Sequence, residues 1–253
     1  MSNEGTNSGL PAPRLSVVVP AYNEEKLLET SVRALRKTLD DIKVTAEIIL
    51  VDDGSTDKTG SIAELLARVV PNVRVYHQAN KGIGGAFLAG AILARGDYLM
   101  LWPVDMPAAP DDVRPYVAQF GEADVIVGCR STRVGYTVLM RFNAWLYPRL
   151  VTLLFGLRIR DVNWIHAYRR TAFLRIRPTQ EGIPMLAETL VRLRDVGATF
   201  AEVDVVMKPR LQGVASASRF RVMRETLSGL LTFWETWRME RKAQPKKGTR
   251  APR

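Results

Sequence analysis

Short apolar runs that end abruptly at acidic and turn-forming residues are the feature that most constrains the fold. The run at 15–20 (LSVVVP) leads into 21–25 (AYNEE), and the run at 48–51 (IILV) leads into 52–57 (DDGSTD). Runs of this length are typical of strands buried on both faces of a parallel sheet. Ligands of open α/β sheets bind outside the carboxyl ends of the strands. We therefore predict a polar ligand pocket where these two runs end.

Segments with helical periodicity separate the apolar runs. Apolar residues recur at helical spacing over 24–39 and 57–69, and further apolar runs follow at 73–77, 98–101 and 125–128. Alternating strands and helices favour an α/β fold with a doubly wound, mostly parallel sheet flanked by helices.

The C-terminal half has a different character. The segments 138–157 and 220–238 are aromatic-rich and amphipathic, and we expect Pro148 to divide the first into two pieces. A further helix is predicted over 187–196 and a strand over 199–207. Amphipathic helices flanked by arginine are suited to a membrane interface, although ordinary core packing would produce a similar pattern.

The chain has 253 residues and a net charge of +10, and the charge is unevenly placed. Seven Lys/Arg and one Glu lie in 238–253, so this segment carries +6 of the +10. We predict disordered tails at 1–13 and 238–253 around a single domain at 14–237. The basic tail would contact anionic lipid at the membrane surface, or would simply keep the protein soluble.

Three absences narrow the partners and the compartment. Basic residues elsewhere are interspersed with acids, and no nucleic-acid-binding motif occurs, so no nucleic-acid partner is expected. Residues 1–13 lack the features of a signal peptide. The single cysteine, Cys129, fits a reducing compartment, and we expect a cytoplasmic protein.

The acidic residues at the strand ends carry the functional signal. Asp52 and Asp53 end one predicted strand, Asp105 follows another, and Tyr22 and Glu24 follow the first. Carboxylates there can accept hydrogen bonds from a base N–H or ribose hydroxyls, or hold a divalent metal on a diphosphate. A capped strand-to-helix turn is the plainer interpretation of residues 52–55 taken alone.

The complete set of motifs is more specific. The segments VVVPAYNEE, VDDGSTDKTG, ANKGIGGAFLAG, GDYLMLWPVDMPAAPDD and VIVGCR resemble, in order and spacing, the family 2 glycosyltransferases of the GT-A fold. The later segments 161–170, 202–213 and 228–237 resemble the polyprenyl-phosphate branch of that family, which includes dolichyl-phosphate mannose synthases.

The resemblance implies a role for particular residues. It assigns nucleotide-sugar binding to Pro20, Ala21, Tyr22, Glu24, Asp52, Asp53, Lys81, Asp105 and Arg210. It assigns acceptor binding to Arg130, Arg141, Asp161 and His166. The catalytic residues would be Asp105, Arg130, Arg141 and Arg210, and Asp105 would also hold the metal.

Departures from the family pattern weaken the metal site. The first carboxylate of the usual Asp-x-Asp is replaced by Pro103, and Pro107 stands where Gln or Ser is usual. Asn163, Trp164 and Ile165 replace Thr-Ser-Gly in the acceptor segment. One carboxylate together with donor phosphates and waters can still bind Mg²⁺ or Mn²⁺, so a divalent cofactor at Asp105 remains the expectation.

The resemblance implies an inverting transfer of a sugar from GDP-mannose or a UDP-hexose to a polyprenyl or dolichyl phosphate. The enzyme would lie peripherally on the cytoplasmic face of a membrane, with a separate membrane-embedded partner as a further expectation. Transfer to a sugar hydroxyl is a second interpretation, and it would require Asp161 or His166 as a base. A non-catalytic nucleotide-sugar-binding protein is a third.

Overall fold

The computed structural model describes residues 12–106, 109–132, 136–180, 182–206 and 220–243. These residues form a mixed seven-stranded sheet of order β3-β2-β1-β4-β6-β5-β7. The strands are β1 (Leu15–Ala21), β2 (Ala46–Asp52), β3 (Val73–His77), β4 (Tyr98–Leu101), β5 (Val125–Arg130), β6 (His166–Arg169) and β7 (Phe200–Val205). Only β6 runs antiparallel to its neighbours, β4 and β5, within this sheet.

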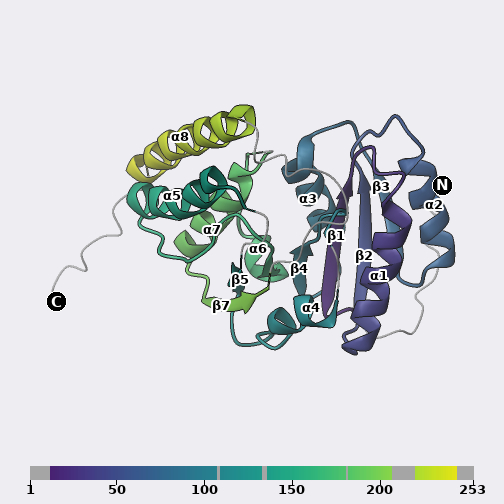
Figure 1. Ribbon diagram of the computed structural model, residues 1–253. Coiled ribbons are helices and arrows are strands. Elements are labelled where there is room, and N and C mark those ends of the chain that lie inside the picture. The colour runs from purple at the N-terminus through teal and green to yellow at the C-terminus, as the bar shows by residue number, and fades with distance from the viewer. Residues whose placement is uncertain (1–11, 107–108, 133–135, 181, 207–219, 244–253) are drawn as a thin grey trace.

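Helices cover both faces of the sheet (Figure 1). The helices are α1 (Leu28–Asp41), α2 (Thr59–Val69), α3 (Gly82–Leu93), α4 (Pro110–Val117), α5 (Val138–Phe155), α6 (Arg170–Phe173), α7 (Pro184–Asp195) and α8 (Phe220–Ala243). One core cluster joins the sheet to α1, α2 and α4. The second cluster joins its other face to α3, α5, α6, α7 and α8. This is the layered α/β arrangement that the alternating pattern predicts.

The central strands are apolar along their whole length because both of their faces are covered. In β1, Val17 and Val19 belong to one core cluster, whereas Val18 belongs to the other. Side chains of a strand alternate between the two faces of a sheet, so a continuous apolar run serves both cores. β3 and β4 begin and end at the predicted residues.

The prediction was wrong at Pro148 and incomplete at β6. α5 is one helix of 18 residues that continues through Pro148. Pro148 has no N–H to donate to the carbonyl of Ala144, and the turn that follows it packs against α8 through Leu154 and Phe155. β6 lies in the segment 161–170, for which the sequence analysis named no strand. α8 continues to Ala243, past the predicted start of the tail at 238.

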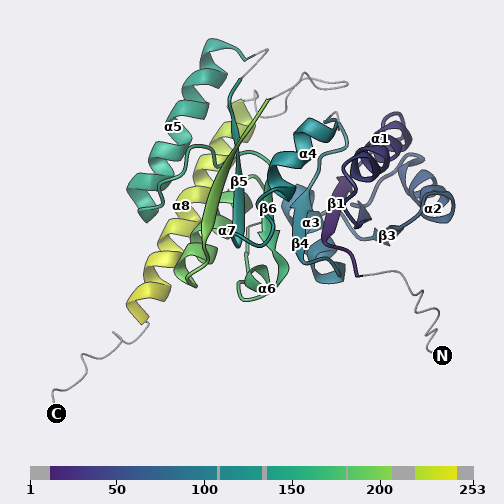
Figure 2. The same cartoon turned by 90° about the horizontal axis from the view of Figure 1, so that it is seen from below.

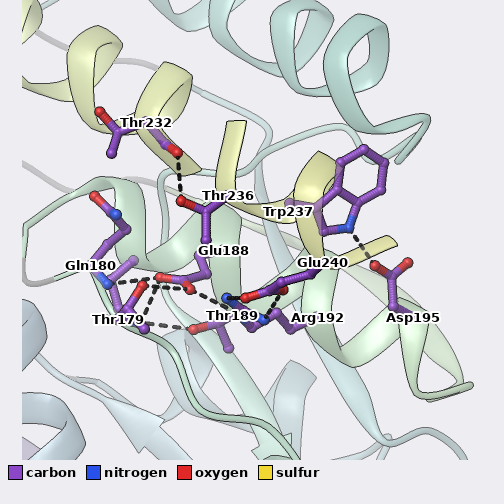
Figure 3. Close-up of polar contacts among 11 residues, drawn as sticks. Thr179, Gln180, Glu188, Thr189, Arg192, Asp195, Thr232, Thr236, Trp237 and Glu240 are labelled. Atoms are coloured by element: carbon purple, nitrogen blue, oxygen red, sulfur yellow. Dashed lines mark hydrogen bonds and ion pairs between the residues drawn. The ribbon is translucent and has the colours of Figure 1, made fainter. Parts of the chain in front are cut away.

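α8 is fixed to α7 by a polar network as well as by apolar packing (Figure 3). The fully buried Glu188 accepts hydrogen bonds from the backbone of Thr179 and Gln180 and from Nε of Arg192, at 2.7–2.9 Å. Arg192 also forms a two-point ion pair with Glu240 of α8, at 3.0 and 3.2 Å. The charge of Arg192 on α7 is thus paired with that of Glu240 on α8, and this ion pair ties the two helices together.

α5 lies beside α8 in both views (Figures 1 and 2). Phe155 stacks on Phe233 with ring centroids 5.0 Å apart, and the Trp234 indole N–H donates to the Leu154 carbonyl at 3.1 Å. The two amphipathic segments predicted from the sequence therefore pack against each other.

Candidate functional site

The carboxyl ends of β1 and β2 meet at one edge of the sheet. Their parallel register places Ala21 opposite Asp52, and the Asp53 N–H donates to the Ala21 carbonyl at 2.9 Å. The loops that follow are also joined, because the Asn23 N–H donates to the Ser55 hydroxyl at 3.0 Å. The two acid-rich loops predicted as a pocket therefore form one connected site.

Asp53 is buried, and one of its oxygens is held by the loop after β3. Oδ1 accepts from the Gln78 amide at 2.7 Å and from the Lys81 backbone N–H at 2.9 Å. No hydrogen bond joins its Oδ2 to any residue in the described ranges. A buried carboxylate with one oxygen anchored and one available is suited to receive an N–H from a ligand.

Asp52 has a different set of partners. Its Oδ1 accepts from the Ser55 backbone N–H at 3.1 Å, and its Oδ2 lies 2.8 Å from Nδ1 of His77. Burial raises the pKa of Asp52, but the hydrogen bonds from Ser55 and His77 outweigh it and lower the pKa overall. Asp52 therefore supports the turn. Its predicted contact with the nucleotide stays a prediction.

Glu24 and Asp105 follow the carboxyl ends of β1 and β4, which are parallel neighbours. Burial raises the pKa of Glu24, and the charges of Asp105 and Asp57 raise it further. The Glu24 backbone is held by the Thr59 hydroxyl at 2.7 Å, and Asp105 follows Val104, whose carbonyl accepts from Ser31 of α1 at 2.5 Å. A cation bound near these two carboxylates would lessen this repulsion.

Other predicted donor residues surround this edge. Pro20 and Ala21 lie in β1, opposite Val51 and Asp52. Tyr22 is 49% exposed, so its ring is accessible to a ligand. Lys81 is exposed and contacts Asp53 only through its backbone. Arg210 and Pro107 lie outside the described residues.

Arg130 and Asp161 form a buried two-point ion pair. Nε and Nη2 of Arg130 lie 2.7 Å from the two oxygens of Asp161, and both side chains are under 10% exposed. Nη1 of Arg130 donates to the Tyr136 hydroxyl, and the guanidinium lies 4.8 Å from the centre of the Trp164 ring. Burial raises the pKa of Asp161, but the guanidinium outweighs it and lowers the pKa overall. Two predicted acceptor ligands are thus engaged with each other.

His166 is buried, whereas Arg141 is exposed on the protein surface. His166 is 1% exposed within β6, its Nε2 donates to the Val162 carbonyl at 3.0 Å, and burial lowers its pKa, so the ring is neutral. Arg141 is exposed on α5, and none of the described residues forms a side-chain hydrogen bond or ion pair with it. The structure therefore does not bring these two predicted acceptor residues together.

Sequence reasoning missed the residues that hold the acids in place. No functional role was predicted for His77 or Gln78. Their signal was present in the sequence, because His77 ends the predicted strand 73–77 and Gln78 follows it, and this strand pairs with the one that ends at Asp52. Likewise, Tyr136 and Trp164 were not predicted as partners of Arg130.

No group of three or more His, Cys, Asp or Glu side chains in the described ranges is arranged to hold a metal. The oxygen-only pair Glu24 and Asp105 nevertheless fits a hard cation that keeps phosphate and water ligands. A surface groove of about 350 Å³ lies elsewhere, between α5 and residues 159–160, and contains none of the predicted donor residues.

Comparisons with known proteins agree with this geometry. The family model "Glycosyl transferase family 2" matches residues 16–191. The undecaprenyl-phosphate 4-deoxy-4-formamido-L-arabinose transferase of Pseudomonas fluorescens (strain Pf0-1) is 31% identical over 188 residues, which cover 72% of this chain and 55% of that protein. The enzyme of the same name from Proteus mirabilis (strain HI4320) is 29% identical over 185 residues, which cover 71% and 57%. The chain thus spans little more than half the length of these curated relatives.

Solved structures share the fold. Glucosyl-3-phosphoglycerate synthase from Mycobacterium tuberculosis, crystallised with Mn²⁺, UDP-glucose and phosphoglyceric acid, superposes with a TM-score of 0.69 and 21% identity, covering 93% of this chain and 82% of that one. Together with the family match, this confirms the predicted resemblance and the predicted GT-A architecture. The chain belongs to glycosyl transferase family 2.

Proposed function

We propose that this enzyme transfers a sugar, with inversion, from a nucleotide diphosphate sugar to a polyprenyl phosphate at a membrane surface. The observation that carries the donor side is Asp53, which is buried and has its Oδ1 anchored at the joined ends of β1 and β2. The curated relatives support the acceptor side, because their names describe sugar transfer involving undecaprenyl phosphate.

In this proposal the nucleoside lies at the edge formed by β1, β2 and β3. Asp53 accepts a base N–H through Oδ2, the exposed Tyr22 ring packs on the nucleoside, and Glu24 lies toward the ribose and diphosphate. Asp105 follows β4 on the same side, where a diphosphate would reach it.

Asp105, with Glu24 beside it, would hold Mg²⁺ or Mn²⁺. A divalent cation bound there would offset the negative charge on the diphosphate leaving group. Arg210 is proposed as a second source of positive charge for the same group, because a guanidinium can bind two phosphate oxygens at once.

The chemistry at the acceptor requires no general base. A phosphate oxygen of the lipid attacks the anomeric carbon from the face opposite the diphosphate, the new C–O bond forms as the old one breaks, and the nucleoside diphosphate leaves. A phosphate ester is ionised at neutral pH, so no proton has to be removed. Arg141 would orient it, and Arg130 would shape the acceptor loop through Asp161 and Trp164.

The two histidines agree with a base-free mechanism. His166 is buried and donates to a backbone carbonyl, whereas His77 lies between two carboxylates. Neither occupies an open position beside Asp105. The second interpretation, transfer to a sugar hydroxyl, therefore gains no support from His166.

The surface formed by α5 and α8 is the proposed membrane contact. On α5, the apolar residues Val138, Leu139, Phe142 and Trp145 are 50–86% exposed. On α8, Leu227, Leu231 and Met239 are 43–64% exposed. Arg149 stacks over Trp145 at 4.0 Å, which places a cation beside an aromatic ring, as is typical of the headgroup region.

No helix in the described ranges combines the length and apolar character needed to cross a bilayer. We propose peripheral binding on the cytoplasmic face, supported by the basic segment at 238–253 and its attraction to anionic lipid. A membrane-embedded partner protein remains part of the proposal.

The test is a transfer assay with purified protein, undecaprenyl phosphate in anionic vesicles and a panel of UDP- and GDP-sugars, with Mg²⁺, Mn²⁺ or EDTA. We expect lipid-linked sugar with one donor class and loss of product in EDTA. Transfer only to a free glycan would replace the proposed acceptor. Donor binding without turnover in any condition would point to the non-catalytic interpretation.

A further inference from the structure

Two neighbouring residues at the end of β3 hold the two consecutive carboxylates at the end of β2. His77 lies opposite Asp52 in the parallel register, and its Nδ1 is 2.8 Å from Oδ2 of Asp52. Gln78 follows directly, and its side-chain amide donates to Oδ1 of Asp53 at 2.7 Å. The Gln78 backbone N–H also donates to the Asp52 carbonyl at 3.0 Å. His77 therefore fixes the Asp52 carboxylate, and Gln78 fixes the Asp53 carboxylate.

The His77 ring contacts a carboxylate through both nitrogens. Nδ1 faces Asp52 of β2, and Nε2 lies 3.0 Å from Glu64 of α2. These are the two ionisable groups that face the ring from the elements packed against it in the described structure. A neutral imidazole has only one N–H, so the doubly protonated ring is the form that satisfies both contacts. The hydrogen bonds to Asp52 and Glu64 accordingly raise the pKa of His77.

The contact with His77 is transmitted to the donor loops. The second oxygen of Asp52 accepts from the Ser55 backbone N–H, and the Ser55 hydroxyl accepts from the Asn23 backbone N–H. The Oδ2 atom of Asp52 also lies so close to Gly60 of α2 that a Cβ there would approach it to 2.8 Å. Asp52 therefore has little room to move, and a change at its Oδ2 would displace the turn that contains Asp53.

We propose that His77 is a positioning residue for the donor nucleotide: its charged ring holds Asp52, and thereby the 52–55 turn, in the geometry that presents Asp53 to the base. This inference rests on the proposed function, since it assigns the site to a nucleotide sugar. His77 itself would contact no substrate.

The protonation state of the His77 ring sets the direction in which donor binding changes with pH. As pH rises through the raised pKa of His77, one N–H is lost. The proton on the Glu64 side leaves, because Glu64 is 50% exposed and Asp52 only 10%. The hydrogen bond that remains between Nδ1 of His77 and Asp52 then comes from a neutral ring and is no longer charge-assisted, so the hold on Asp52 weakens and donor binding weakens with it. Binding is therefore strongest below the pKa of His77 and declines above it.

The test is calorimetric binding of UDP-glucose and GDP-mannose at about pH 6 and about pH 8, a range in which the sugar diphosphate does not titrate but histidine does. For the wild type we expect the Kd of the bound donor to rise about threefold between the two pH values. His77→Gln should bind about fivefold more weakly at the lower pH and lose the pH dependence.

Glu64→Gln is the matched control, because it removes only the exposed outer contact. We expect its Kd at the lower pH to equal that of the wild type, and NMR titration of the ring should show a lower pKa for His77. This variant and the wild-type pH profile keep the test decisive if His77→Gln folds poorly.

The outcomes separate the two proposals. A folded His77→Gln that binds the donor as tightly as the wild type, with the same pH profile, would overturn the positioning role and leave the proposed function intact. If the wild type binds neither nucleotide sugar, the proposed function fails and the inference fails with it.

Discussion

The donor edge and the acceptor region differ in how their charged residues are used. At the donor edge, Asp53, Glu24 and Asp105 follow the carboxyl ends of three neighbouring strands, β2, β1 and β4. In the acceptor region, Arg130 and Asp161 neutralise each other in the interior, and Arg141 lies apart on α5. A charged residue in a family motif can therefore serve either the ligand or the fold, and only its partners distinguish the two.

The largest effect is expected from breaking the buried ion pair of the acceptor region, between Arg130 and Asp161. Arg130→Met leaves Asp161 as an uncompensated buried carboxylate, and we expect a loss of about 3–5 kcal/mol in the free energy of unfolding. Urea denaturation measures it. The double variant Arg130→Met/Asp161→Leu should recover most of the loss, because two apolar groups leave no buried charge. A single variant as stable as the wild type would show that the pair is solvated.

A somewhat smaller effect is expected at the donor edge, and there on activity instead of stability. Asp105→Asn should lower kcat about a hundred- to a thousandfold, since it removes the charge that would hold the cation at the leaving group. The transfer assay measures it, and the melting temperature serves as the control. Turnover equal to that of the wild type would remove Asp105 from the mechanism.

Asp53→Asn tests recognition separately from chemistry. Replacing the carboxylate should weaken donor binding about tenfold, the value of one charge-assisted hydrogen bond, while folding stays intact. Calorimetry with UDP-glucose and GDP-mannose gives the ratio of the Kd of the variant to that of the wild type. Asp111→Asn, an exposed acid on α4, is the control and should bind normally. Equal affinities of the two variants would contradict the role of Asp53.

An effect as small as that of Asp53→Asn is expected on the surface of α5, and there on membrane binding. Phe142→Ser/Trp145→Ser should reduce partition onto anionic vesicles about tenfold, because two half-exposed aromatic rings can no longer be buried in lipid. Vesicle sedimentation measures it. Ile92→Ser, which alters a 75% exposed residue on α3, should have no effect. Equal losses in both variants would show that the apolar contact is nonspecific.

Much of the N-terminal half could be predicted because its signals are local. A buried parallel strand is a continuous apolar run, so β3 and β4 could be bounded to the residue. The C-terminal half was harder. β6 is short and antiparallel, and its pairing with β4 and β5 joins residues that are far apart in the sequence. Pro148 was predicted to divide a helix that in fact continues, because the packing of its last turn against α8 offsets the local effect of the proline.

The sequence by itself determined the family, the α/β class and the strand ends that carry Tyr22, Glu24, Asp53 and Asp105. These follow from periodicity and motif order, which are written along the chain. Only the tertiary structure decided which charges are available. It paired Arg130 with Asp161, buried His166 within β6 and placed His77 between two carboxylates. The physical reason is that an ion pair depends on the distance between atoms in space, and residues 31 positions apart meet only when the sheet has formed.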